Sequence, residues 1–373
     1  MQEFINLMVI RLKNLDTKFI MRDLHTLIYL FFILMLNLSC VEKKATEKVI
    51  NQSELLSNSK TDTLKFGSGI SSIFQDSKGN YWFGIHNGGI CKYDGKTFDY
   101  FTTNEGLLNN QIRCIQEDKK GNILVATAKG LSIYDGQKFT NYSTNTNEPI
   151  VEWNKTNGDL WFYAGEEEGI NRFDGINMNY LIFPKPKNQD PYNVYGVTDM
   201  SKDKDGIVWI ATYAALFNYD GKMVNIFDNE KLNLNENELL HIRSVLADSK
   251  GRIWIGNNGI GVLLKEGETT TNFSEKHKLI HPTSTRRGDK SQPGTLEHVF
   301  AIEEDSEENI WFGDRDTGAW KYDGKTMTNY TIDKNLKSQM VWAIYKDNSN
   351  SLLFGMADGG VYKFNGKLFE KMF

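Results

Sequence analysis

The sequence predicts an all-β fold, a seven-bladed β-propeller in which each blade is a four-stranded antiparallel sheet. Two observations lead to this prediction. A segment typified by "WFG" recurs seven times along the chain. A tight-turn pair, usually Asp-Gly, follows each copy about twelve residues later. A segment that recurs in this way along the chain indicates a repeat architecture, in which each copy is one structural unit.

The tryptophan position is expected on the second strand of each unit, between adjacent sheets, where an aromatic side chain buries about 150–250 Å². Its equivalents are Trp82, Leu124, Trp161, Trp209, Trp254, Trp311 and Leu353. The turn pairs begin at Asp94, Asp135, Asp174, Asp220, Glu266, Asp323 and Asn365. The units fill the chain from Ile70 to Phe373, which leaves no room for a second folded domain.

The second unit shows the strand pattern most clearly. Its runs "IRCIQED", "ILVAT", "LSIYD" and "QKFTNY" alternate β-branched or aromatic residues with polar ones, between Gly, Asn and Asp. The pair Asp135-Gly136 suits a type I′ hairpin, because both central residues of that turn take positive φ. Four short strands in each repeat are typical of propellers, and a closed ring is favoured over an open stack because no polar capping repeat is visible.

The third and the last units of the repeat array need separate interpretation. The third unit, Ile150–Met178, matches worst: Lys155 replaces the recurrent Asp, and the first strand is one residue short. The last unit is expected to finish with an outer strand at Phe373. Residues Asp62–Phe66 are expected to add an edge strand to that last blade.

The N-terminal region predicts export. Leu27–Leu38 is an apolar run of twelve residues, too short for the about 20 that span a bilayer and typical of a signal peptide. The following "LNLSC" resembles a bacterial lipobox, although Asn37 stands where Leu is usual. We therefore expect a signal peptide at 1–39 (with Met21 as an alternative start), a lipidated Cys40 heading a flexible tether at 40–65, and the propeller at 66–373.

This interpretation places the protein in the cell envelope, lipid-anchored on the periplasmic side or at the cell surface. Two alternatives stay open: a cleaved signal without lipid, and an internal core segment. The formal charge of −5 argues against a nucleic-acid partner, which would favour a basic face. Cys91 and Cys114 fall in predicted strands and are expected to be small buried residues rather than a disulfide framework. We expect a monomer.

The composite unit "V-x-x-I-x-x-D-x-x-G-x-x-W-x-G-x-x-x-G-G-x-x-x-Y-D-G-x-x-F" resembles the two-component regulator propeller repeat. Ile70–Phe98 and Val299–Met327 match it best. The resemblance implies a periplasmic sensor-type module of the kind that responds to carbohydrates. This sequence shows no second propeller, membrane-spanning helix, kinase or receiver segment. We therefore expect binding of a carbohydrate or peptide ligand, or of an envelope protein, without a signalling activity, a cofactor or a metal.

The phrase "GxIWFG" is also similar to the repeats of streptogramin lyases, propellers that use His and Glu with a magnesium ion. This resemblance implies an enzymatic alternative, with His241 or His298 as base and Glu166 or Asp314 as an acidic or metal-holding group. A third alternative is a structural scaffold in an envelope assembly. His277 and His281 are spaced for a metal on a helix, but the following Pro282 favours a loop without metal.

The binding face can be predicted from loop lengths. In a propeller the inter-blade loops and the loops between second and third strands emerge on one face, and here these loops vary most, especially Thr271–His298. Variable loops on a rigid scaffold usually carry binding. Aromatic residues beside Arg, Asn and Asp on that face suit a sugar or peptide. His86 and Glu166 lie on these loops, and the candidates are Gln111, Arg113, Tyr195, Tyr213, His241, Arg243, Asn257, His298, Asp314, Arg315 and Trp342.

Overall fold

The computed structural model describes residues 68–144, 147–150, 153–155, 158–165, 167–184, 194–235, 238–284 and 289–373. The chain divides into two compact units, Met1–Asn51 and Gln52–Phe373, and all described residues lie in the second. The expected signal peptide, Cys40, the tether and the edge strand at Asp62–Phe66 lie outside the described residues.

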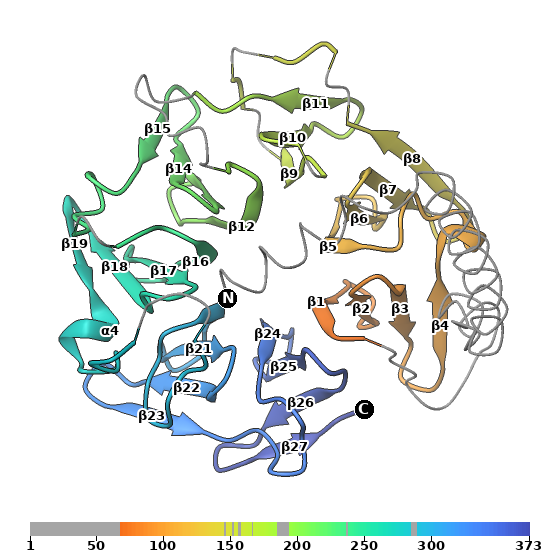
Figure 1. Ribbon diagram of the computed structural model, residues 1–373. Coiled ribbons are helices and arrows are strands. Elements are labelled where there is room, and N and C mark those ends of the chain that lie inside the picture. The colour runs from red at the N-terminus through yellow and green to blue at the C-terminus, as the bar shows by residue number, and fades with distance from the viewer. Residues whose placement is uncertain are drawn as a thin grey trace, which may run out of the picture. The chain divides into compact units, whose positions relative to one another are not determined.

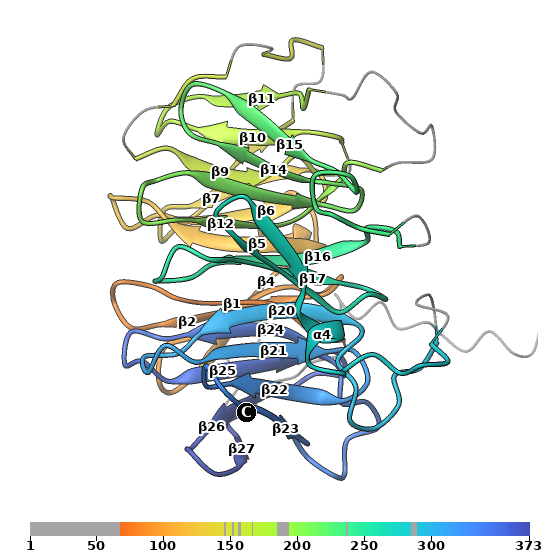
Figure 2. The same cartoon turned by 90° about the vertical axis from the view of Figure 1, so that its left-hand side faces the viewer.

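The described unit is a seven-bladed β-propeller, as the sequence predicts. Figure 1 shows the sheets arranged radially, with β1, β5, β12, β16 and β24 innermost. Figure 2, turned by 90°, shows neighbouring sheets lying face to face. Within each blade, consecutive strands pair antiparallel in chain order.

Blades one and two contain β1 (Ile70–Gln75), β2 (Tyr81–Ile85), β3 (Gly89–Tyr93), β4 (Phe98–Phe101), β5 (Ile112–Glu117), β6 (Ile123–Thr127), β7 (Gly130–Tyr134) and β8 (Phe139–Ser143), with η2 (Thr103–Glu105) between them. Blades three and four contain β9 (Leu160–Tyr163), β10 (Ile170–Phe173), β11 (Met178–Leu181), β12 (Val197–Lys202), β13 (Val208–Thr212), β14 (Leu216–Tyr219) and β15 (Val224–Phe227).

Blade five contains β16 (Ile242–Ala247), β17 (Ile253–Asn257), β18 (Val262–Glu266) and β19 (Thr269–Asn272), and α4 (Phe273–Lys276) follows it. Blades six and seven contain β20 (Val299–Glu304), β21 (Ile310–Asp314), β22 (Gly318–Tyr322), β23 (Met327–Tyr330), β24 (Val341–Lys346), β25 (Leu352–Met356), β26 (Val361–Phe364) and β27 (Phe369–Lys371).

A hydrogen bond between a turn and an indole explains the recurrent "D-x-x-G-x-x-W". In blade six, Asp305 Oδ1 accepts the backbone N–H groups of Glu307 and Asn309, and its Oδ2 accepts the Trp311 indole N–H at 2.8 Å. The same Asp–Trp bond joins Asp76 to Trp82, Asp203 to Trp209 and Asp248 to Trp254. One carboxylate thus caps the turn and fixes the indole, which is buried between blades.

Blade three departs from the pattern where the sequence match is weakest. In the described residues its sheet has three strands, β9 to β11, and none on the channel side of β9. Ile150 instead forms a parallel bridge with Leu181, at the outer strand. Trp153 stacks on Trp161 with ring centres 6.0 Å apart. Ile150 therefore contacts the third blade's outer strand, and Trp153 packs on that blade's tryptophan.

Contacts between the seventh and first blades close the ring. The Tyr81 hydroxyl donates to Asp347 at 2.8 Å, and the backbone N–H of Gln75 donates to the Tyr345 hydroxyl at 3.0 Å. The ring of Phe373 packs edge-on against Phe83, with centres 5.5 Å apart. The two ends of the repeat array are thereby joined as neighbours.

Candidate functional site

A repeated backbone irregularity builds the channel mouth. In each of the six inner strands the register with the second strand skips the second residue of the inner strand. A β-bulge bends a strand and re-aims a side chain. The bulged residues are Ser71, Arg113, Thr198, Arg243, Phe300 and Trp342. All six line one cavity at the mouth of the channel.

This cavity has a volume of about 380 Å³, within the range of about 300–1,000 Å³ usual for ligand pockets. His86, Gln111, Ile112, Tyr163, Val197 and Tyr213 complete its lining. A second cavity of about 290 Å³ shares all six bulged residues and Tyr163, and continues along the inner strands. The mouth therefore opens into a channel rather than ending in a shallow depression.

Tyr163 occupies a position that four other blades give to glycine. A Cβ at Gly84 would lie 2.7 Å from Ile112 of the next blade, so the "WFG" glycine permits close approach of inner strands. Tyr163 follows "WF" in blade three, where the described residues place no inner strand beside β9. Its hydroxyl donates to the backbone carbonyl of Thr198 at 2.7 Å. The phenol ring thus forms the channel wall at the third blade.

Aromatic rings form the opposite wall. The Trp342 indole packs on His86, with ring centres 4.8 Å apart. Gly69 makes room for this indole, since a Cβ there would lie 2.5 Å from it. Phe300 lies on the adjacent inner strand. The wall offers ring faces on which a flat ligand can stack.

Two arginines, Arg113 and Arg243, line the same cavity as these rings. The Arg243 guanidinium carbon lies 4.3 Å from the centre of the Phe300 ring, and Nη1 donates to the Tyr213 hydroxyl at 3.2 Å. Burial lowers the pKa of Arg243, and the charge of Arg113 acts in the same direction. Among the described residues neither arginine forms an ion pair, and the Nε atoms of both are buried without a hydrogen-bond partner.

Two carboxyl groups lie further along the inner strands, in the second cavity. Burial raises the pKa of Asp199 to about 7 and that of Glu303 to about 7. Asp199 Oδ2 accepts the backbone N–H of Val245 at 3.0 Å. The channel is therefore basic at its mouth and acidic deeper.

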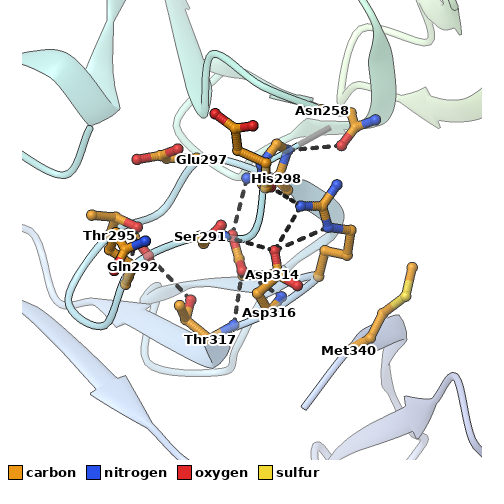
Figure 3. A network of polar contacts seen from close by, with 12 residues as sticks. Asn258, Ser291, Gln292, Thr295, Glu297, His298, Asp314, Asp316, Thr317 and Met340 are labelled. Carbon is orange, nitrogen blue, oxygen red and sulfur yellow. Dashed lines mark hydrogen bonds and ion pairs between the residues drawn. The ribbon is translucent and has the colours of Figure 1, made fainter. Parts of the chain in front are cut away.

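A separate polar cluster fixes the long loop before β20 (Figure 3). His298 Nδ1 lies 2.8 Å from Asn258 Oδ1, and the His298 backbone N–H donates to Asp314 Oδ2 at 3.0 Å. Asp314 Oδ1 accepts the N–H groups of Asp316 and Thr317. His298 and Asp314 are both 0% exposed. Burial lowers the pKa of His298 and raises that of Asp314 to about 6. The cluster is inaccessible to a substrate in this conformation.

The structure brings part of the predicted set together. Gln111, Arg113, Tyr213, Arg243 and Trp342 line the mouth, as does His86. His241 packs beside it on Tyr213, with ring centres 5.1 Å apart.

The other predicted residues lie elsewhere. Tyr195 is buried in the core between the third and fourth blades. Asn257 is buried at the end of β17. Arg315 pairs with Asp316, and Asp316 is labelled in Figure 3. Glu166 lies outside the described residues.

Sequence reasoning missed Ser71, Tyr163, Thr198 and Phe300. Three of these directly follow the first β-branched residue of their unit, a signal that the repeat alignment contains. Tyr163 departs from the glycine of "WFG", which is also visible in the alignment.

The described residues contain no group of three or more His, Cys, Asp or Glu able to hold a metal ion. His277 packs on Phe273, with ring centres 4.2 Å apart, while His281 Nδ1 lies 2.9 Å from the Thr283 hydroxyl. In the part of the chain that is described, we find no helix with the length and apolar character needed to cross a bilayer.

Comparison with known proteins identifies the same kind of repeat in the sequence. The sequence model of the family "Two component regulator propeller" matches residues 106–129, 191–214 and 239–259, so the chain carries repeats of this family. No curated protein matches by sequence. Similar solved structures include the extracellular domain of BT3049 from B. thetaiotaomicron, described as a hybrid two component system, with a TM-score of 0.60 and 22% identity over 82% of this chain. This chain covers 40% of that one.

Two further similar structures are more distant in sequence. Virginiamycin B lyase from Staphylococcus aureus has a TM-score of 0.60 and 15% identity, over 82% of this chain and 97% of that one. YCF48 bound to D1 peptide has a TM-score of 0.55 and 11% identity, over 82% of this chain and 94% of that one. At these identities the likeness concerns the fold.

Proposed function

We propose that this propeller, built of two component regulator propeller repeats, is an exported sensor-type module that binds a carbohydrate or peptide ligand at its channel mouth and carries out no chemistry. The observation that carries the proposal is the cavity of about 380 Å³ ringed by six bulged side chains. Stackable rings and unpaired donors within one cavity of ligand size are the features expected of a small-molecule site.

Export and anchoring form the second part of the proposal. The apolar run before Cys40 and the lipobox-like "LNLSC" support an envelope protein held by lipid at Cys40. The BT3049 structure is an extracellular domain, which agrees with this location. The short polar stretch at 40–65 then serves as tether, so that the propeller meets ligands away from the membrane surface.

The lyase alternative has weaker support. His298 and Asp314 are both 0% exposed and bind the polypeptide itself. The His241 ring packs on that of Tyr213, and its Nδ1 lies 3.4 Å from Asn258 Nδ2, while the described lining of the mouth cavity includes no carboxylate. The described geometry therefore favours binding over proton transfer.

Calorimetric screening of mono- and oligosaccharides and short peptides tests the proposal. For the tightest ligand found, Trp342→Ala should lower affinity about tenfold, equivalent to about 1.4 kcal/mol of lost ring contact. Tyr142→Ala, on the outer strand β8, removes a ring away from the cavity and should leave affinity unchanged. Equal affinity of wild type and Trp342→Ala for that ligand would place binding elsewhere. No binding across the panel, together with a co-purifying envelope protein, would support the scaffold alternative.

A further inference from the structure

Arg113 and Arg243 stand on opposite sides of the third and fourth blades, on β5 and β16. Tyr163 and Thr198 lie between them on the channel wall. Both arginines line the same cavity, and the charge of Arg113 contributes to the lowering of the Arg243 pKa, after the larger effect of burial. Two like charges therefore share one cavity.

No described group neutralises this pair. Neither arginine has an ion-pair partner in the described residues, and the buried Nε of each lacks a hydrogen bond. Other arginines of the chain are paired: Arg172 with Asp159, Arg252 with Asp248 and Arg315 with Asp316. Leaving buried charged donors unmatched is unfavourable for folding, because desolvation is not compensated. A structural role does not account for this arrangement.

We infer that the ligand carries an anionic group, a carboxylate, sulfate or phosphate, which Arg113 and Arg243 hold at the channel mouth while a ring of the ligand stacks on Trp342 and Phe300. This inference rests on the proposed function. The planar guanidinium fork matches such oxyanions through paired N–H donors. Phe300 and Tyr213 already hold the Arg243 plane in place, so little side-chain freedom is lost on binding.

The acidic groups deeper in the channel define the position of the anion. Asp199 and Glu303 line the second cavity, which reaches deeper along the inner strands than the mouth, and the charge of Lys346 acts to lower the pKa of Glu303. A ligand anion placed there would meet like charge whenever these carboxyls are ionised. The anionic group is therefore held at the mouth, and the neutral part of the ligand extends over the aromatic wall.

The test compares D-glucuronate and glucose 6-phosphate with D-glucose, and includes inorganic sulfate, by calorimetry on the full propeller. We expect at least one of the two acidic sugars to bind about tenfold tighter than glucose or more, the gain typical of one charge-assisted bond pair. Arg113→Gln and Arg243→Gln should each remove most of this gain, so that affinity for the acidic sugars falls to about the affinity that the same variant has for glucose. Arg243→Lys, which keeps the charge without the fork, should fall between.

Lys129→Gln is the matched control, since it removes an exposed positive charge from the loop between β6 and β7, outside the cavity. It should leave the preference for acidic sugars intact. The ¹⁵N-labelled Nε–H signals of Arg113 and Arg243 give a second readout, and they should shift saturably on titration with sulfate or glucuronate. Urea midpoints equal to or above that of wild type confirm that the variants fold, and a rise is expected for the arginine variants because an unmatched charge is removed.

The outcomes separate the two proposals. If glucose binds as tightly as both acidic sugars and Trp342→Ala weakens all three, channel binding stands and the anionic-group inference is wrong. If Lys129→Gln acts as strongly as Arg113→Gln, general charge attraction replaces the arginine pair. If the arginine signals do not respond to sulfate, glucose 6-phosphate or glucuronate, the inference is wrong whatever the screen of neutral ligands shows. Preference for the phosphate or the carboxylate sugar identifies the kind of anion.

Discussion

Glu303, a carboxyl group in the channel, makes the stability of the protein depend on pH. Burial raises its pKa to about 7, and the charges of Asp199 and Glu304 act in the same direction. In the unfolded chain its pKa returns to about 4.3. The folded state therefore binds a proton more tightly than the unfolded state. The resulting contribution to stability is present in full below pH 4.3 and is lost as pH rises through about 7.

Glu303→Gln should therefore raise the free energy of unfolding above pH 7 by about 1–2 kcal/mol, a value reduced from the full pKa difference because water in the channel screens the charge. Near pH 4 the gain should vanish, because the wild-type carboxyl is then protonated in the folded state. Urea unfolding at both pH values measures the effect. Glu307→Gln, on an exposed turn of the same blade, should change little at either pH. A gain that is equal at both pH values would contradict the raised pKa.

At the scale of the element, blades three and six make opposite demands on the residue that follows "WF". A Cβ added at Gly313 would lie 2.7 Å from Val341, because the next inner strand packs directly on it. Tyr163 at the same position is 8% exposed, and its ring fills the space beside β9. Ala126 and Ala211 occupy the position in blades two and four. An alanine substitution is therefore predicted to destabilise blade six at Gly313 and blade three at Tyr163, for different reasons.

Gly313→Ala should lower the free energy of unfolding by about 1–3 kcal/mol through overpacking. Tyr163→Ala should lower it by about 3–5 kcal/mol, because removal of a buried ring leaves a cavity. Tyr163→Phe, which loses only the bond to Thr198, should cost about 1 kcal/mol. Chemical denaturation measures all three. A Tyr163→Ala variant as stable as Tyr163→Phe would show that the ring does not fill the gap.

The sequence allowed the regular elements to be predicted because their causes are local. In four units the turn Asp accepts a hydrogen bond from the indole six positions later, as Asp305 does from Trp311. The positions of Ile150 and Trp153 could not be predicted, because they depend on contacts with Leu181 and Trp161 in the folded blade.

The part of the candidate site that lies on the repeated strands could be predicted from the sequence, and the part that depends on the long loop could not. Arg113, Arg243 and Trp342 stand at a repeated position beside a β-branched residue, so their common location follows from the repeat. The burial of His298 and Asp314 depends on how the long loop folds back, and loop polarity alone does not reveal it.

At the scale of the whole molecule, each blade packs on two neighbouring blades. The first and last blades have two neighbours only because the ring closes. Phe373 supplies part of this closure, with ring centres 4.8 Å from Tyr93 and 5.3 Å from Phe98. Side-chain hydrogen bonds from Tyr81 to Asp347 supply another part. We expect the packing of blades one and seven to be sensitive to loss of the Phe373 ring, which contacts several aromatic residues of the first blade.

Phe373→Ala should lower the free energy of unfolding by about 1–2 kcal/mol, less than the about 1.5–3 kcal/mol of a fully buried Phe because the Phe373 ring is half-buried. Because the loss falls at the closure, amide hydrogen exchange should rise in blades one and seven and stay unchanged in blade four. Phe139→Ala removes a matched ring that packs on Phe101 between blades one and two, with centres 5.7 Å apart. It should raise exchange there and leave blade seven protected. If Phe373→Ala raises exchange equally in all blades, the ring opens as one cooperative unit and closure has no special weakness.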